Sequence, residues 1–177
     1  MKRIVVLGTI ALALSATAAN AQRARSSGGA IELGIDGGVT FAFSDPNTTI
    51  VALPDQSFRL GYFLNDKAEL EPRFNLNSAH GGGFSATSFD FELGLLLIPK
   101  GDRVGKGLYV RPFLGIVGLS GDLGDDNTGY AGAGVGLKIP FADRRLAWRS
   151  EANYAHAFSN GGSNQLGLST GFSWFTR

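Results

Sequence analysis

The clearest feature of the chain is a strict alternation of apolar and polar positions. In residues 67–77 every even-numbered residue is Ala, Leu, Pro or Phe, and every odd-numbered residue is Lys, Glu, Arg or Asn. A period of two predicts a β-strand with one apolar and one charged face. Eleven residues is long for a strand of a globular protein but typical of a strand that crosses a membrane at a tilt.

The same alternation recurs along the rest of the chain. It covers residues 31–43, 58–64, 88–98, 108–118, 130–141, 146–158 and 166–176. Turns or loops are expected at 44–56, 65–66, 78–83, 99–106, 119–128, 142–144 and 159–163. Because no helical pattern separates the strands, short connections predict an antiparallel meander. We therefore expect an all-β fold, an eight-stranded antiparallel up-and-down transmembrane β-barrel, in which closure removes both sheet edges.

Glycine placement predicts which face points inward. Ten strand glycines share the polar face, whereas only Gly37 and Gly118 fall on the apolar face. Since the interior of an eight-stranded barrel is narrow, the glycine-rich polar face is expected to line the lumen and the apolar face to meet lipid. Aromatic residues are expected to form belts at the two rims. One belt is Phe41, Phe43, Phe58, Phe89, Phe91, Tyr130 and Phe158, and the other is Tyr62, Phe141, Trp148, Phe172 and Trp174.

The start of the chain predicts export. Residues 1–21 combine basic Lys2 and Arg3, an apolar run and an Ala-Asn-Ala cleavage site, which is typical of a secretory signal peptide. Residues 22–29 are expected to be a flexible lead-in and residues 30–177 the barrel domain. By hairpin counting, the termini and the turns at 65–66, 99–106 and 142–144 share one side, expected to be periplasmic. The loops at 44–56, 78–83, 119–128 and 159–163 share the outer side.

Composition excludes several function classes. Residues 22–177 carry 14 basic and 15 acidic residues with no basic block, which gives no electrostatic reason to expect nucleic-acid binding. The chain has no cysteine, so disulfides, thiol chemistry and a lipoprotein anchor are excluded.

Charged residues on the polar face are the main candidate site. They are Glu32, Asp36, Arg59, Glu69, Glu71, Arg73, Asp90, Glu92, Arg111, Lys138, Arg149 and Glu151. This many carboxylates can indicate acid–base catalysis or metal binding. The near balance of charge favours a network of ion pairs that fills the lumen, with Arg73 and Arg111 as its expected hub, and with no metal and no cofactor. A narrow porin-like conduit for ions or small solutes is the alternative.

Three segments carry a family resemblance: Glu69-Leu70-Glu71-Pro72-Arg73-Phe74, residues 109–115 and residues 171–175. In them residues 30–177 resemble the small eight-stranded outer-membrane β-barrels of Gram-negative bacteria, the OmpA/OmpX-like family. The resemblance implies contact with outer-membrane lipid and lipopolysaccharide. It also implies the outer-membrane assembly machinery as a partner, which in the family reads an aromatic last residue. Here Thr176 and Arg177 follow Phe175. Fold alone does not specify activity.

Two further motifs are candidate sites. His156 and Ser159 distantly resemble the hydrolytic pair of outer-membrane lipid A deacylases, but two residues separate them and no acidic residue follows to orient the histidine. We therefore expect no enzyme, with a lipid A-modifying hydrolase as an alternative. Asp122, Asp125 and Asp126 can bind a divalent cation or a basic headgroup, but a solvated acidic loop is the simpler interpretation. The expected role is structural or surface interaction.

Overall fold

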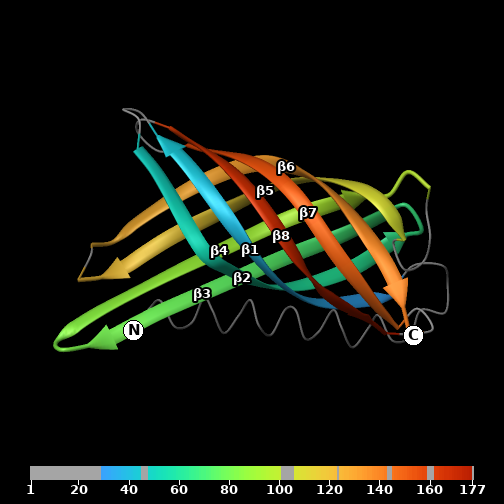
Figure 1. The fold of residues 1–177 in the computed structure, drawn as a ribbon, viewed down its shortest axis with the longest axis horizontal. Coiled ribbons are helices and arrows are strands. Elements are labelled where there is room, and N and C mark those ends of the chain that lie inside the picture. Colours follow the sequence, from blue (N-terminus) through green and yellow to red (C-terminus); the bar gives the residue numbers. More distant parts are fainter. Residues whose placement is uncertain are drawn as a thin grey trace.

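A computed structural model of the protein describes residues 29–44, 48–100, 106–122, 124–142, 145–158 and 162–176. It contains eight strands, and each pairs antiparallel with its neighbours. They are β1 (Ile31–Ser44), β2 (Thr48–Asn65), β3 (Ala68–Gly81), β4 (Phe84–Leu97), β5 (Gly107–Gly121), β6 (Asp126–Phe141), β7 (Leu146–Ala157) and β8 (Ser163–Phe175). Because β1 also pairs with β8, the barrel is closed, which confirms the predicted fold class (Figure 1).

The two ends of the barrel differ in their connections. The end where β1 begins and β8 ends is termed the terminal end, and the end that carries the β3–β4 turn is termed the hairpin end. At the terminal end the β2–β3 turn is Asp66-Lys67, one residue later than predicted, and the Asn65 side chain accepts a hydrogen bond from the Lys67 amide at 2.8 Å. No helix in the described ranges has the length and apolar character that a membrane crossing needs.

At the hairpin end the strands run further than predicted. β3 and β4 continue through most of the expected 78–83 loop to a two-residue turn at Gly82 and Gly83, whose φ angles of 59° and 83° suit glycine. Likewise, β5 extends to Gly121 and β6 begins at Asp126, so the expected 119–128 loop is short. The β3–β4 hairpin projects at the lower left of Figure 1.

The predicted loop at 44–56 is wrong, because residues 48–56 belong to β2. Pro54 made a strand unlikely there, since proline has no amide hydrogen for the ladder. The strand accommodates it with a bulge: Gly38 pairs with Asp55 and Thr40 pairs with Ala52, so two residues of β2 stand opposite one residue of β1.

The strands are strongly tilted. Following pairing partners from Ile35 through β2, β3, β4 and β5 leads to Gly129 on β6, whereas the path through β8 and β7 leads to Ile139. The two positions are ten residues apart (139 minus 129), which is the stagger of the closed barrel. A stagger of this kind requires tilted strands, so side chains from distant strands reach the same level of the lumen.

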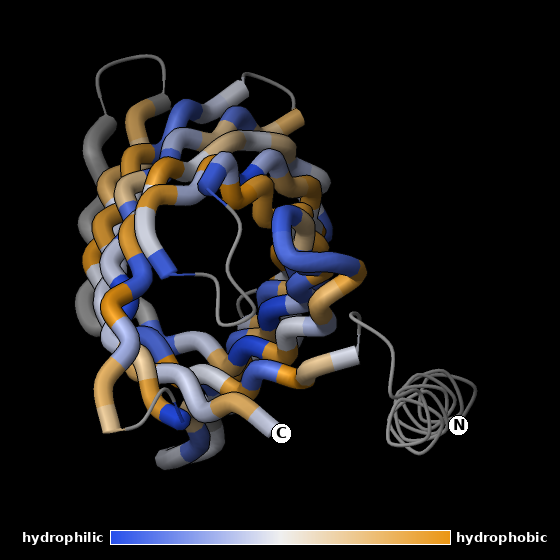
Figure 2. Tube along the Cα trace, turned by 90° about the vertical axis from the view of Figure 1, so that its right-hand side faces the viewer, coloured by the Kyte–Doolittle hydropathy of each residue, from blue (hydrophilic) through white to orange (hydrophobic). Residues whose placement is uncertain are grey.

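Glycines face the lumen, as predicted. A Cβ atom on Gly61 would lie 1.8 Å from Glu69 Oε1, and one on Gly136 would lie 2.1 Å from the Tyr109 ring. The alternate positions are apolar and exposed; Phe58, for example, is 64% exposed. Along the barrel the two kinds of residue alternate in each strand (Figure 2). The expected apolar outer face is therefore confirmed.

The predicted signal peptide and most of the predicted lead-in, residues 1–28, lie outside the described residues. Gly29, the last residue of the lead-in, already belongs to the barrel edge. Its amide donates to the Phe63 carbonyl at 3.0 Å, and the Phe63 amide donates to the Ala30 carbonyl at 3.1 Å.

Candidate functional site

The charged residues predicted for the polar face meet inside the barrel. Eleven of the twelve are buried, and Asp90 is half-buried. They come from seven of the eight strands, and the alternation of each strand aims them inward. Buried charges persist only when they are paired and hydrogen-bonded, so the contacts of each group decide what the site can do.

Glu71 on β3 is one centre of the network. Its carboxylate lies 2.9 Å from Arg73 Nε, 3.3 Å from Arg59 Nη1 and 3.8 Å from Arg111 Nε, and it also accepts from Arg149. One acidic residue thus joins arginines from β2, β3, β5 and β7 across the lumen.

Glu151 on β7 is the second centre. It accepts from Arg73 at 3.0 Å and from Arg111 and Arg149 at 2.6 Å each. It also accepts from the Tyr109 hydroxyl at 2.8 Å. The predicted hub residues, Arg73 and Arg111, do share their carboxylate partners, but the structure centres the network on acidic side chains that each bind several arginines.

The network continues toward the terminal end. Arg59 donates to Glu32 at 2.7 Å and lies 2.5 Å from Asp36, while Lys138 Nζ lies 2.5 Å from Glu32 and 2.7 Å from Glu69. Glu32, Glu69 and Glu71 lie close enough together to hold a metal, since one oxygen of each falls within 4.8 Å of the others. Lys138 and the arginines pair with all three carboxylates, and of these oxygens Glu69 Oε1 is buried without a hydrogen-bond partner.

An apolar cluster lies in the lumen at the terminal end. Phe63, Leu96, Ile98 and Tyr109 are buried together, and Ala30 and Phe175 pack against them. The cationic Lys138 Nζ lies 5.5 Å from the centre of the Phe63 ring. Sequence reasoning missed this cluster, although the signal was present: Phe63 and Leu96 are apolar residues on the same face as Arg59 and Glu92.

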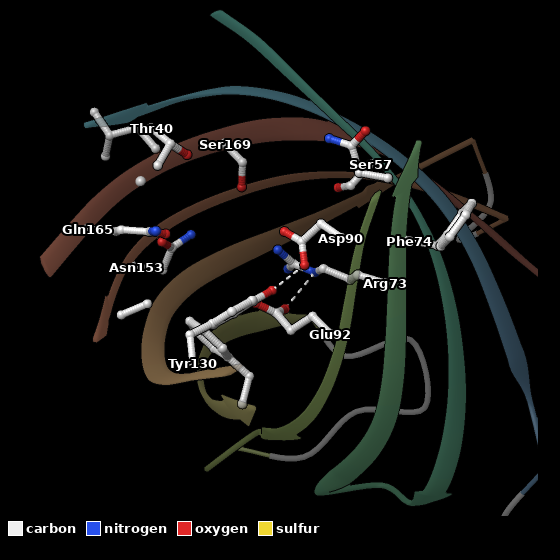
Figure 3. Close-up of a pocket in the computed structure, with 15 residues that line it drawn as sticks. Thr40, Ser57, Arg73, Phe74, Asp90, Glu92, Tyr130, Asn153, Gln165 and Ser169 are labelled. Atoms are coloured by element: carbon white, nitrogen blue, oxygen red, sulfur yellow. Dashed lines mark hydrogen bonds and ion pairs between the residues drawn. The ribbon is translucent and has the colours of Figure 1, made fainter. Parts of the chain in front are cut away.

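A polar cavity occupies the hairpin half of the lumen (Figure 3). It has a volume of about 80 Å³. Its lining includes Thr40, Ser57, Arg73, Asn75, Asp90, Glu92, Phe113, Tyr130, Asn153, Gln165 and Ser169. This cavity is termed the cup. The lumen is therefore layered, from an apolar floor at the terminal end through the ion-pair network to the cup.

Tyr130 was predicted in an aromatic belt, and this is wrong. It lies on the lumen face of β6 and is only 6% exposed. Its hydroxyl donates to Asp90 at 2.5 Å, and its ring meets the Phe113 ring edge-on at 6.1 Å between centroids. Its position near a rim suggests an aromatic belt. In the alternation of β6, however, Tyr130 lies on the same inward face as Gly132 and Gly134. A buried tyrosine hydroxyl needs a partner, which Asp90 provides.

The remaining belt residues lie on the outer face. Nine are clearly exposed: Phe43, Phe58, Tyr62, Phe91, Phe141, Trp148, Phe158, Phe172 and Trp174. Phe41 and Phe89 are half-buried, and the Phe89 ring packs closely on Gly118. Their division between two membrane interfaces stays a prediction.

The described residues include His156 of one further motif and Asp122 of the other. His156 is exposed on the outer face, where its Nδ1 lies 3.0 Å from Asn164 Oδ1 and its ring lies 5.9 Å from the Phe158 ring. Ser159 lies outside the described residues. In the acidic segment, Asp122 accepts a hydrogen bond from the Ser85 amide at 2.6 Å, which ties β4 to the end of β5.

Comparisons with known proteins agree with this architecture. Among solved structures, Neisserial surface protein A (NspA) matches with a TM-score of 0.60 and 15% identity, covering 82% of this chain and 98% of that one. The outer membrane protein AlkL, in lipid bilayers, matches with a TM-score of 0.54 and 13% identity, covering 87% and 94%. At these identities the likeness concerns the fold alone. The comparison with curated proteins found no match.

A family model identifies the chain more directly. The model described as the outer membrane protein beta-barrel domain matches residues 9–174, which is most of the chain. This match agrees with the closed eight-stranded barrel, the apolar outer face and the charged lumen described above. The chain therefore belongs to the outer membrane protein β-barrel domain family, the β-barrels of the bacterial outer membrane.

Proposed function

We propose that this protein is a sealed outer-membrane barrel with a structural or surface-interaction role, and that its lumen does not conduct. The observation that carries the proposal is the stack of cross-lumen ion pairs on an apolar floor. Glu71 and Glu151 each bind arginines from several strands, and Phe63, Leu96 and Ile98 fill the space beneath. An eight-stranded barrel is only wide enough for side chains to fill, so this packing leaves no path for ions.

The hairpin end is proposed to face the outside of the cell, and the terminal end the periplasm. Lipopolysaccharide and outer-membrane lipid are the proposed neighbours of the apolar face, and the assembly machinery is the proposed partner during insertion. Export by a signal peptide over residues 1–21 belongs to the same proposal. The aromatic last strand supports recognition by that machinery, since Phe172, Trp174 and Phe175 lie in β8.

Planar-bilayer recording tests whether the lumen is sealed. Purified protein inserted into a lipid bilayer should give no steady conductance, because the ion pairs and the apolar floor occupy the lumen. Arg73→Gln and Arg111→Gln are the diagnostic variants, and a bilayer with detergent alone is the control. Steady, ion-selective conductance of the wild type that changes in these variants would establish the narrow conduit as the function instead.

The protein is also proposed not to be an enzyme. His156 contacts Asn164, and no acidic side chain is described within hydrogen-bonding reach of its ring. Mass spectrometry of lipid A from cells that overexpress the wild type or His156→Ala tests this point. Both samples should contain the same acyl chains. Loss of an acyl chain with the wild type alone would establish a lipid A hydrolase.

A further inference from the structure

The seam between β2 and β3 is paired over only part of its length. The pairs described there are Phe58 with Phe74, Arg59 with Arg73, Tyr62 with Leu70, Phe63 with Glu69 and Asn65 with Ala68. The same register would set Ser57 opposite Asn75, and β2 reaches back to Thr48 while β3 runs on to Gly81, yet no pair between these parts of the two strands is described. Figure 1 shows β2 and β3 diverging toward the hairpin end. Residues 48–57 and 75–81 are termed the unpaired seam.

Local sequence explains why pairing stops. The bulge between Gly38 and Thr40 of β1 lies opposite the unpaired part of β2, and a bulge bends its strand and increases the twist. Pro54 lies in the same part of β2 and has no amide hydrogen to donate to a ladder. Without a backbone ladder, side chains alone separate the lumen from the surroundings along the unpaired seam.

The cup borders the unpaired seam. Ser57 on β2 and Phe74 and Asn75 on β3 line the cavity at the level where pairing stops. Phe74 alternates with inward-facing Arg73, so its side chain belongs to the outer face, and it is 38% exposed. Figure 3 shows Ser57 and Phe74 on one side of the cup, across from Gln165. The cavity therefore lies next to the lipid-facing surface at this seam.

The outer face changes polarity at the same level. On β3 the outward-facing Phe74 and Leu76 are apolar and exposed, whereas the next outward position, Ser78, is polar and exposed. On β2 the apolar Phe58 is followed toward the hairpin end by exposed Gln56. A membrane barrel is apolar where it meets hydrocarbon and polar beyond it, so the unpaired seam begins where lipid headgroups are expected.

The cup offers hydrogen bonds rather than free charge. Arg73 and Glu92 lie 3.7 Å apart and each pairs with further members of the network. The polar side chains of the cup that make no hydrogen bond to another described residue are Ser57, Asn153, Gln165 and Ser169. Because amides and hydroxyls both donate and accept, they suit an uncharged group that carries hydroxyls.

The volume of the cup limits the size of such a group. About 80 Å³ has room for roughly five to eight water-sized groups, since one water needs about 10–15 Å³ of such space. A glycerol head is of this size, whereas a larger group would have to displace the ion-paired side chains beneath it.

We propose that the cup binds the uncharged, hydroxyl-bearing head of a single-chain amphiphile, such as a monoacylglycerol, which enters from the membrane through the unpaired seam. The head meets Asn153, Gln165 and Ser169. The acyl chain stays outside against Phe58 and Leu76, which are 64% and 57% exposed. This binding role goes beyond the proposed sealed barrel and does not depend on it, because the unpaired seam lies in the wall and not at the apolar floor.

Photo-crosslinking tests the site. The wild-type protein is reconstituted in phospholipid vesicles that contain a trace of monooleoylglycerol with a diazirine in its acyl chain, and crosslinked peptides are identified by mass spectrometry. Crosslinks to residues 56–58 and 74–76 should exceed those to the exposed Leu114 on β5 at least about tenfold, which corresponds to a preference of about 1.4 kcal/mol. Unlabelled monooleoylglycerol should compete, whereas free glycerol and oleic acid at the same concentration should not.

A matched set of variants assigns the crosslinks to the cup. Ser169→Leu fills part of the cavity, and Gln165→Leu removes an amide without touching an ion pair, so both should abolish the excess of crosslinks at the seam. Ser150→Leu is the matched control, because it makes the same change on the outer face of β7, outside the cup, and should leave the excess unchanged. Heat-dependent migration on gels shows that each variant is folded.

Four results would overturn the proposal. Crosslinks spread evenly over the outer face would reject a site at the seam, and an unchanged excess in both Ser169→Leu and Gln165→Leu would reject the cup. Free glycerol that competes as well as monooleoylglycerol would assign the cup to soluble polyols. Oleic acid that competes equally would reject the uncharged head. None of these results changes the bilayer conductance, so failure of this proposal and failure of the sealed barrel are distinguishable.

Discussion

The two halves of the lumen are built from the same strands but differ in how their interiors are packed. Toward the terminal end the interior is filled: Phe63, Leu96 and Ile98 form a floor, and buried ion pairs lie above it. Toward the hairpin end, the interior keeps a cavity in which Ser57, Asn153, Gln165 and Ser169 make no hydrogen bond to another described residue. The same barrel thus has a packed interior over part of its length and a polar cavity on the other part.

Side-chain length explains the difference. In the filled half, glycines make room for long neighbours: Gly34 lies against the Arg59 guanidinium, Gly61 against Glu69 and Gly136 against Tyr109. In the other half, short residues such as Ser57 and Ser169 line the wall. These side chains are too short to cross the lumen, so a cavity remains between them and Tyr130.

Removing a central charge of the filled half should have the largest effect. Glu71→Gln keeps the shape of the side chain but leaves four arginines without their shared carboxylate, so the free energy of unfolding should fall by about 3–5 kcal/mol. Urea unfolding in lipid vesicles measures the change. Ser57→Ala, in the other half, is the control. A loss below about 1 kcal/mol would show that Glu71 is not a centre of the network.

The comparison of the two halves depends on the charged face being inside. Leu95→Arg places a charge on the opposite, apolar face of β4 and should cost about 2–4 kcal/mol and impair membrane assembly. Assembly and heat resistance in outer-membrane fractions measure both effects, with Leu95→Met as a volume-matched control. A water-soluble, folded Leu95→Arg protein of unchanged stability would mean that the faces are inverted.

The sequence predicted the strands, their faces and the charged residues that point inward, because all three follow from a period of two. It did not predict where strands end. Residues 78–81 and 120–121 carry polar or small side chains typical of loops, yet backbone pairing continues there because the ladder does not depend on side-chain polarity. Pro54 concealed a strand because the bulge that accommodates it depends on pairing with β1, which the local pattern of apolar and polar residues does not show.

The pairing of charges inside the lumen was harder to predict than which residues point into it. Which charges pair depends on the stagger of the barrel, which brings Glu71 and Arg149 together from strands that are not neighbours. No local pattern encodes that stagger. The position of Tyr130 was available from parity alone, and it was missed because an aromatic residue near a rim was assigned to a belt.

Adding volume to the filled half should have a moderate effect. A Cβ atom in Gly136→Ala would lie 2.1 Å from Tyr109 ring atoms, and Tyr109 is held by Arg149 and Glu151, so the variant should lose about 1–3 kcal/mol. Gly81→Ala is the matched control, because a Cβ there meets no described atom within 4 Å. Vesicle unfolding of both variants measures the difference, and equal stability would show that the filled half is loosely packed.

The smallest effect is expected at a side chain of the cup that makes no hydrogen bond to another described residue. Ser169→Ala removes a hydroxyl that makes no hydrogen bond to another described residue, so the free energy of unfolding should change by no more than about 0.5 kcal/mol. Tyr130→Phe is the contrasting variant in the same cup. It removes the 2.5 Å hydrogen bond to Asp90 and should cost about 1–2 kcal/mol, because Asp90 loses a buried donor. We compare the unfolding free energies of the two variants. The comparison distinguishes cup side chains that stabilise the barrel from cup side chains that are available to bind a ligand. If Ser169→Ala proved as costly as Tyr130→Phe, the cup would belong to the packed interior, and the contrast between the two halves would fail.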